Sequence, residues 1–234
     1  MESTTTGQFK DATRVLVSVL APAERRTLRF LAARMPAWVN SDHLTVLALV
    51  AMFGAGLSYW LASRTPIGLV LVVPCLALNW FGDSLDGTLA RYRGHQRPRY
   101  GYYVDHVIDA FGALFLLGGL ALSGFMSPLV AMGLLVAYLM LAVEIYLSAH
   151  VLGEFKITYF QFGPTELRIL LAVGTLWLLV RPTATILGQS YRVFDVGGVV
   201  AMVGLTVTLL STVVGHVRTL YRAEPIPRSQ SERP

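Results

Sequence analysis

Charged side chains are scarce in this sequence. Asp, Glu, Lys and Arg make up 14% of its 234 residues, whereas 54% are hydrophobic, and soluble domains carry roughly 25% charged residues. The single cysteine, Cys75, lies within an apolar run, which excludes an intramolecular disulfide and a two-cysteine redox motif. The long apolar runs also lack the alternation of polar and apolar residues that marks membrane β-strands. These absences argue against an ordinary soluble domain and favour a helical bundle in lipid.

Six apolar segments are candidates for crossing a hydrocarbon core of roughly 30 Å. They cover residues 44–62, 67–82, 102–122, 129–149, 167–180 and 193–217, and the fifth is the shortest. We therefore expect an all-α integral membrane protein whose domain spans residues 41–220 and contains six transmembrane helices.

The flanking segments differ from this domain in composition. Residues 1–40 are expected to be a cytoplasmic segment. Within it, residues 23–35 place Leu28 and Leu31 on one face and arginines elsewhere, which predicts an amphipathic helix on the membrane surface. A solvated helix beside the membrane is the alternative. Residues 221–234 are polar and rich in proline, so we expect a disordered tail.

Basic residues predict the orientation in the membrane. With six spans both termini lie on one side, and all but three of the 19 Lys and Arg residues fall there, the exceptions being Arg64, Arg181 and Arg192. The positive-inside rule then places both termini in the cytoplasm, and the compact size favours a bacterial plasma membrane over the endoplasmic reticulum. The net charge of +5 indicates attraction to anionic headgroups or phosphates, and nucleic acid is not needed as a partner.

Four aspartates fall at the junction of the second and third apolar segments. Asp83 and Asp86 are three residues apart and Asp105 and Asp109 are four apart, so each pair lies on one helical face. Antiparallel helices with a short connection bring the pairs to similar depth, where four carboxylates repel unless they are protonated or neutralised. Oxygen-only ligands suit hard cations. Two divalent cations would balance the four negative charges and stabilise the attacking and leaving oxygens of a displacement at phosphorus.

The residues between the two pairs fit a phosphate-handling site. Gly87 and Ala90 are small enough for a bulky ligand to approach the backbone, Arg91 can reach a phosphate oxygen, and Gly101 leaves room where the third span begins. The aspartates alone are also compatible with a structural ion cluster or with the proton or cation pathway of a transporter.

The stretch that contains these residues resembles the signature of the CDP-alcohol phosphotransferase family. It reads D-S-L-D-G-T-L-A-R over residues 83–91 and G-Y-Y-V-D-H-V-I-D over residues 101–109. The family signature is D-x-x-D-G-x-x-A-R, a short spacer and G-x-x-x-D-x-x-x-D, and every fixed position is present. The resemblance favours an enzyme over a transporter. It also disfavours prenyltransferases, whose metal-binding aspartates lie on widely separated helices.

The resemblance implies an activity and a set of roles. A phospho-alcohol or phosphatidyl group passes from a CDP-linked donor to a lipid or small alcohol hydroxyl, in phospholipid biosynthesis, and CMP leaves. Two divalent cations, Mg²⁺ or Mn²⁺, are implied, and Asp109 is the candidate base for the acceptor hydroxyl. The implied metal ligands are Asp83, Asp86, Asp105 and Asp109, and the implied contacts to CDP are Gly87, Ala90, Arg91 and Gly101.

Residues outside the signature suggest a substrate. Residues 163–166 (G-P-T-E) and His106 resemble the choline and ethanolamine phosphotransferase branch, which joins a CDP-amino-alcohol to a lipid hydroxyl. That branch also carries a Glu and a His that Glu144 and His150 would represent. We therefore expect a CDP-ethanolamine or CDP-choline donor. The alternative is CDP-diacylglycerol with a soluble acceptor such as glycerol phosphate, inositol phosphate or serine, for which Arg168 could supply a contact.

Several of these residues also fit purely structural roles. Glu166 fits a helix start as well as a substrate contact, and Arg168 fits a determinant of membrane orientation. Asn40 and Thr45 resemble the beginning of the family's first span, and they also fit a helix cap and a helical threonine. Glycines at 54, 56, 118, 119, 197 and 198 permit close helix contact and are compatible with a homodimer.

Overall fold

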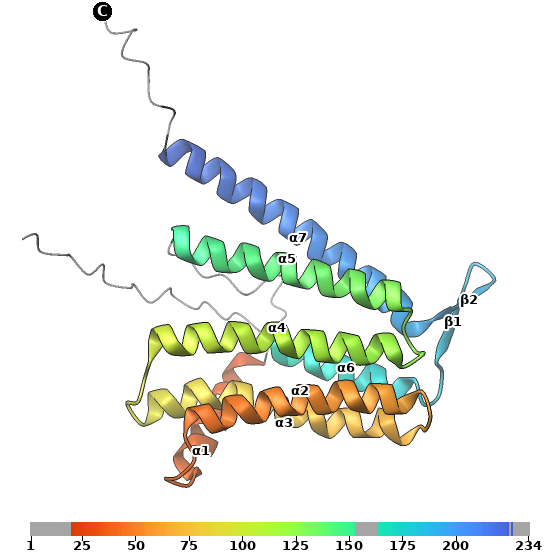
Figure 1. The fold of residues 1–234 in the computed structure, drawn as a ribbon, viewed down its shortest axis with the longest axis horizontal. Helices are drawn as coiled ribbons and strands as arrows, with labels where there is room; N and C mark the ends of the chain where they lie inside the picture. The colour runs from red at the N-terminus through yellow and green to blue at the C-terminus, as the bar shows by residue number, and fades with distance from the viewer. Residues whose placement is uncertain (1–19, 153–162, 225, 227–234) are drawn as a thin grey trace, which may run out of the picture.

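The computed structural model describes residues 20–152, 163–224 and 226. Over this part the chain forms helices and one β-hairpin (Figure 1). The elements are α1 (Ala21–Arg34), α2 (Ser41–Ala62), α3 (Ile67–Tyr92), α4 (Pro98–Leu122), α5 (Pro128–Leu152), α6 (Pro164–Trp177), β1 (Thr183–Ile186), β2 (Gln189–Arg192) and α7 (Val193–Ala223).

The helices α2 to α7 run alternately from one end of the molecule to the other (Figure 1). α2 begins, α3 ends and α4 begins beside α1, at what we call the α1 end. The turns after α2 and α4 lie at the opposite end with the β-hairpin, which we call the hairpin end. Because α6 returns the chain to the hairpin end, α7 finishes on the side where α2 starts, and it leans away from the other helices as it does so.

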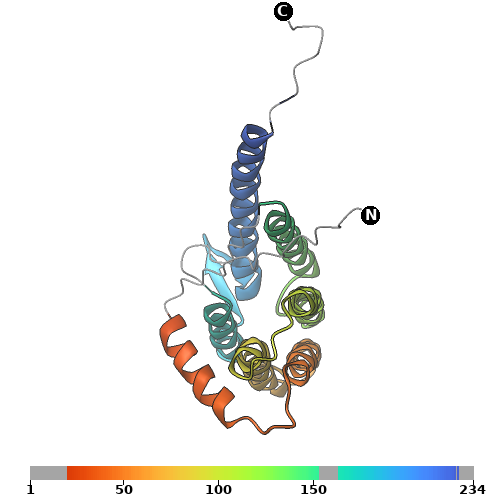
Figure 2. The ribbon, with the colours of Figure 1, turned by 90° about the vertical axis from the view of Figure 1, so that its left-hand side faces the viewer.

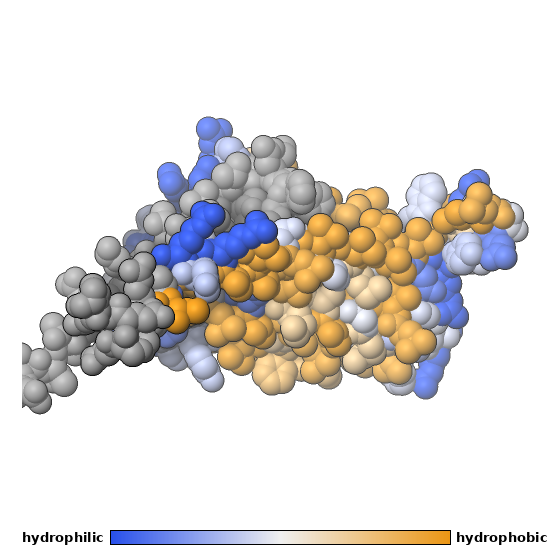
Figure 3. Space-filling model, turned by 90° about the horizontal axis from the view of Figure 1, so that it is seen from above, coloured by the Kyte–Doolittle hydropathy of each residue, from blue (hydrophilic) through white to orange (hydrophobic). Residues whose placement is uncertain are grey.

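Five helices are long and apolar enough to cross a membrane, among the residues that the structure describes. They are α2, α3, α4, α5 and α7, and they correspond to five of the six predicted spans. The remaining predicted span is α6, whose 14 residues give a length of about 21 Å against the roughly 30 Å of a hydrocarbon core. Apolar side chains form a band across the middle of the molecule, with hydrophilic side chains towards both ends (Figure 3).

The predicted helix over residues 23–35 is present as α1. Figure 2 looks along α2, α3 and α4 and shows α1 from its side, lying across the end of the bundle. Its Leu28 and Ala32 are buried in a cluster with Leu85 and Leu89 of α3. An exposed face of α1 is basic: Arg25, Arg26 and Arg29 are exposed and, with Pro22, line a hollow of about 340 Å³. That α1 rests on a membrane surface stays a prediction.

A short β-hairpin departs from the all-α prediction. Thr183 pairs with Arg192 and Ile186 pairs with Gln189 in an antiparallel ladder. The two residues between the strands, Leu187 and Gly188, have φ of 51° and 81°. Positive φ at both central residues is typical of the two-residue turns that match the twist of paired strands, and glycine adopts it without steric cost. The hairpin joins α6 to α7 at the hairpin end.

The helix boundaries differ from the predicted spans where polar residues begin. α3 continues to Tyr92, ten residues beyond the predicted limit at residue 82, and α4 begins at Pro98 rather than at residue 102. Hydropathy marks where lipid ends and not where backbone hydrogen bonding ends, so both aspartate pairs lie within helices. The predicted tail at 221–234 begins inside α7, and residues 1–19, 225 and 227–234 lie outside the described part of the chain.

Glycines allow the closest helix contacts. A Cβ added at Gly119 of α4 would lie 2.1 Å from the carbonyl oxygen of Gly56 on α2, and one at Gly198 of α7 would lie 2.7 Å from Val130 on α5. Gly118 and Gly197 have open space instead. Several of the glycines noted in the sequence therefore serve packing within one chain, and the homodimer stays a prediction.

Candidate active site

The first aspartate pair is set in the half of α3 that packs closely against α2. A Cβ at Gly82 would lie 2.5 Å from the carbonyl oxygen of Leu44, so only glycine allows this approach. It brings Thr45 of α2 to Asp86, which is 6% exposed. The Thr45 hydroxyl donates to Asp86 Oδ2 at 2.7 Å, and the backbone N–H of Gly87 donates to Asp86 Oδ1. Asp86 is thus a buried carboxylate with donors on both oxygens.

Asp83 is paired with a cation from a distant helix. Arg168 of α6 donates from Nη2 to Asp83 Oδ2 at 2.6 Å and from Nε to Asn79 Oδ1 at 2.8 Å. Asn79, one turn before Asp83, is buried and donates from Nδ2 to the carbonyl oxygen of Ala48 on α2 at 3.1 Å. The predicted substrate contact Arg168 therefore lies in the aspartate site.

The second aspartate pair faces the first. Asp86 of α3 interacts electrostatically with Asp105 of α4 as well as with Asp83. Tyr138 of α5 interacts with both Asp109 and Asp83, and also with Arg168. Carboxylates from α3 and α4 and a phenol from α5 are therefore close enough to interact electrostatically, and a joint metal site formed by the four aspartates stays a prediction.

The four aspartates have the oxygen ligands that suit the implied metal, but their side chains are not arranged as a formed metal site. Carboxylate oxygens are the ligands that Mg²⁺ and Mn²⁺ prefer. Within the described ranges, however, no three His, Cys, Asp or Glu side chains are grouped so that they could hold a metal ion. Asp83 Oδ2 accepts from Arg168 and Asp86 Oδ2 accepts from Thr45. A metal at Asp83 would compete with the Arg168 guanidinium for this oxygen, whereas Asp86 can accept from the Thr45 hydroxyl and bind a metal at the same time, because each carboxylate oxygen has two lone pairs.

The predicted CDP contacts lie on α3 and at the start of α4, close to the aspartates along the chain. Arg91 folds back along its helix: its Nη2 donates to Thr88 Oγ1 at 3.3 Å, and a Cβ on Gly87 would lie 3.3 Å from its Nη1. A Cβ on Gly101 would meet nothing within 4 Å among the described residues, so this helix start has free space beside it. Ala90 is half-buried between these elements. Their role in binding CDP stays a prediction.

The remaining predicted contacts, Glu144, His150 and Glu166, are not shown in contact with the aspartates, and two of them have other partners. Glu144 of α5 pairs with His216 of α7, Nδ1 to Oε1 at 2.6 Å, rather than with His150, which is exposed in the last turn of α5. Glu166 accepts hydrogen bonds from the backbone N–H groups of Gly163 and Leu20 at 3.0 and 3.2 Å. Glu166 thus caps the start of α6, as the structural alternative predicts, and its role as a substrate contact stays a prediction.

His106 also has a place beside the aspartates. Its ring lies 4.1 Å from that of Tyr102 and 4.3 Å from that of Tyr146, measured between centroids. Tyr146 also interacts electrostatically with Asp105 and Asp109. The aromatic side chains of α4 and α5 therefore wall the aspartate site on its α5 side.

Asn79 and Tyr138 were missed by sequence reasoning although they adjoin the aspartates. Both are polar residues within predicted apolar spans. Polar residues are rare in such spans, and this rarity is the signal that could have marked them.

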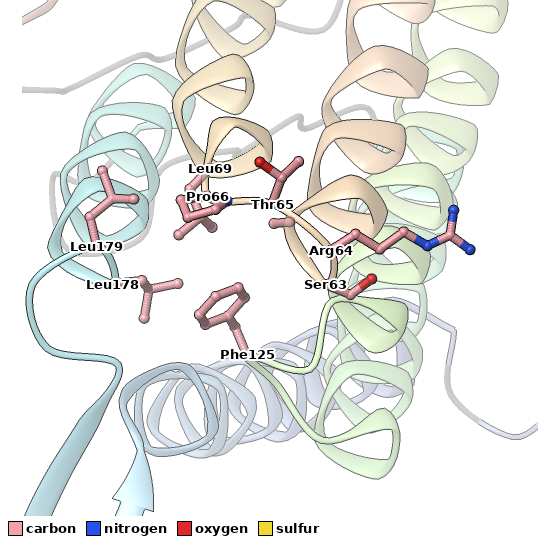
Figure 4. Close-up of a pocket in the computed structure, with 9 residues that line it drawn as sticks. Ser63, Arg64, Thr65, Pro66, Leu69, Phe125, Leu178 and Leu179 are labelled. Carbon is pink, nitrogen blue, oxygen red and sulfur yellow. The ribbon is translucent and has the colours of Figure 1, made fainter.

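A hollow at the hairpin end is a weaker candidate for a functional site (Figure 4). It measures about 250 Å³ and is lined largely by apolar groups such as Phe125 and Leu178, and Arg64 is the one cation in its lining.

Comparison with known protein families agrees with the resemblance. The model of the CDP-alcohol phosphatidyltransferase family matches residues 38–220, a range that holds both aspartate pairs, Arg168 and the helices that carry them. No curated protein matches the chain.

Proposed function

We propose that this chain, which belongs to the CDP-alcohol phosphatidyltransferase family, joins a phospho-alcohol or phosphatidyl group to a hydroxyl acceptor with release of CMP. The family consists of transferases that move a substituted phosphate group from a CDP-alcohol to an acceptor, generally with a divalent cation. The observation that supports this activity here is that carboxylates of α3 and α4 interact electrostatically with one another and with the same tyrosine of α5.

The aspartates have distinct tasks in the proposed reaction. Asp109 accepts the proton of the acceptor hydroxyl, and the oxygen attacks the phosphorus that bears the alcohol, whose bond to the CMP oxygen breaks. Asp83, Asp86, Asp105 and Asp109 are the residues that would hold two divalent cations, Mg²⁺ or Mn²⁺. When bound, these would neutralise charge on the diphosphate. The small residues Gly87 and Gly101 leave room for the CDP part of the donor, and Arg91 supplies a cation for it.

Two donors remain candidates. A CDP-ethanolamine or CDP-choline donor with a lipid hydroxyl acceptor is supported by the resemblance of His106 and residues 163–166 to that branch. CDP-diacylglycerol with a soluble acceptor is favoured by Arg168, because a half-buried guanidinium beside the aspartates can bind an anionic acceptor. The partner of Glu144 is His216, so the Glu144–His150 pair gives the first candidate no support.

The site is proposed to face the cytoplasm, with both termini on the same side. The alternating course of α2 to α7 supports this, because it places the basic segment between α3 and α4 at the same end as α1 and the last turns of α7. Arg64, Arg181 and Arg192, which the sequence assigns to the other side, belong to the hairpin end. The positive-inside rule assigns the α1 end to the cytoplasm, and a bacterial plasma membrane remains the proposed location.

Release of CMP tests the reaction and identifies the donor. Purified protein with Mg²⁺ or Mn²⁺ is expected to release CMP from one of CDP-choline, CDP-ethanolamine and CDP-diacylglycerol, each supplied with matched acceptors. Excess EDTA is expected to stop release, and added Mn²⁺ to restore it. Full release of CMP in EDTA would contradict the metal-dependent mechanism. If no donor gives CMP, a cation transporter becomes the remaining hypothesis, and a cation flux assay is the next measurement.

Thr45→Val is expected to lower CMP release by about 10- to 100-fold while the protein stays folded. Valine keeps the shape of threonine but removes the hydroxyl that donates to Asp86 Oδ2 at 2.7 Å, and groups that orient metal ligands are typically worth this much. The matched control is Thr206→Val, because the Thr206 hydroxyl donates only to the backbone of its own helix at Met202. Equal turnover of the two variants would show that Thr45 does not orient Asp86.

A further inference from the structure

Arg168 is held beside the aspartates by two of its three nitrogen groups. Nη2 donates to Asp83 Oδ2 and Nε to Asn79 Oδ1. The third group, Nη1, is buried and has no hydrogen-bond partner within the described part of the chain. A buried unsatisfied donor is costly, so its presence in the aspartate site points to an acceptor that arrives from outside the protein.

The backbone that carries Arg168 is fixed on α3 and α1. Thr165, one turn earlier on α6, donates to Glu24 Oε1 at 2.7 Å, and the same carboxylate oxygen accepts from Trp80 Nε1 at 2.9 Å and Ser84 Oγ at 3.2 Å. Glu24 therefore joins α1, α3 and α6 next to Asp83. With α6 held at its first turn, the guanidinium of Arg168 can change partners only by rotation of its own side chain.

A divalent cation would compete with Arg168 for Asp83. The guanidinium is hydrogen-bonded to Asp83 at 2.6 Å, so the positive charge of Arg168 lies directly beside one of the proposed metal ligands. A guanidinium bonded to a ligand of a doubly charged ion is repelled by that ion. Asn79 remains available to hold Nε while Nη2 leaves Asp83.

We propose that Arg168 is the resident counter-cation of Asp83: it pairs with this carboxylate before the metal binds, is displaced from it by the metal, and then binds an anionic oxygen of the substrate. The inference rests on the proposed function and adds that Arg168 and the metal compete for Asp83. Arg168 therefore weakens metal binding and also contacts the substrate, with its buried Nη1 bonded to the substrate anion.

Binding of Mn²⁺ alone tests the competition without turnover. The full-length protein in detergent is titrated with Mn²⁺, and the free ion is followed by its EPR signal. Arg168→Gln is expected to bind Mn²⁺ about three- to tenfold more tightly than the unmodified protein, because a competing positive charge is lost. Arg168→Lys keeps the charge and is expected to stay within about twofold. The matched control is Arg97→Gln, which removes the exposed ion pair with Asp42 and is expected to change nothing.

The other outcomes are distinct. Weaker Mn²⁺ binding by Arg168→Gln would show that Arg168 stays on Asp83 as an orienting partner of a metal ligand, and unchanged binding would show no coupling, so either result overturns the proposal. If the unmodified protein binds no Mn²⁺, the metal-dependent function fails and the competition with it. At saturating Mn²⁺, Arg168→Gln is expected to lose turnover by about tenfold or more, and undiminished turnover would refute the substrate contact.

Discussion

Replacing Asp86 with Asn is expected to lower CMP release by at least about 10²-fold and to leave the protein folded. Asparagine has the size of aspartate, and its side-chain oxygen can still accept from the backbone N–H of Gly87. Its amide can face the Thr45 hydroxyl, which accepts as well as donates. What disappears is the negative charge of a carboxylate that interacts with Asp83 and Asp105, and the proposed charge stabilisation at phosphorus depends on it.

The measurement is CMP release at saturating Mn²⁺ together with thermal unfolding of the protein in detergent. Near-normal turnover of Asp86→Asn would contradict a role for Asp86 as a metal ligand. A useful comparison is Asp195→Asn: Asp195 accepts from the backbone N–H of Ser127 at the hairpin end, far from the α1 end. This variant removes a carboxylate from the hairpin end of the bundle and is expected to keep its turnover.

The aspartates could be predicted from the sequence because their arrangement is local. Residues three or four apart share a helical face wherever the helix lies, and a loop of a few residues forces α3 and α4 to be neighbours. The same local reasoning placed Gly87 and Arg91 close to Asp86 along the chain. Family resemblance then assigned roles to positions that local geometry had already brought together.

The partners of these residues could not be predicted, because they depend on which helices touch. Arg168 meets Asp83 across 85 positions of sequence, and Glu144 meets His216 across 72. An acidic residue in a span indicates that a partner exists, but spacing does not say which one. Glu144 was grouped with His150 because of the resemblance to one branch of the family, whereas the packing of α5 on α7 decides its contact.

Helix ends and the hairpin show a second limit. Hydropathy predicted a span ending at residue 82, yet α3 continues through the polar stretch to Tyr92, because a helix with satisfied backbone hydrogen bonds need not stop at the edge of the lipid. Strands β1 and β2 have four residues each, too few for a period-2 pattern to stand out beside the long apolar helices.

The largest effect on stability is expected from Gly119→Ala. A Cβ there would lie 2.1 Å from the carbonyl oxygen and 2.5 Å from the Cα of Gly56, and both are backbone atoms of α2 that no side-chain rotation can move away. The helices α2 and α4 would have to separate, so we expect a loss of about 3 kcal/mol or more, at the upper end of overpacking effects.

Thermal unfolding in detergent measures this loss, and the neighbouring Gly118→Ala is its control. Gly118 lies in the same helix, but a Cβ there would meet nothing within 4 Å in the described structure, so alanine is expected to be neutral or stabilising by up to about 1 kcal/mol. Equal melting temperatures for the two variants would contradict the close α2–α4 contact. Because Asp109 lies ten residues before Gly119 on α4, separation of the helices would also move Asp105 and Asp109 away from α3. Any Gly119→Ala protein that still folds is therefore expected to lose CMP release as well.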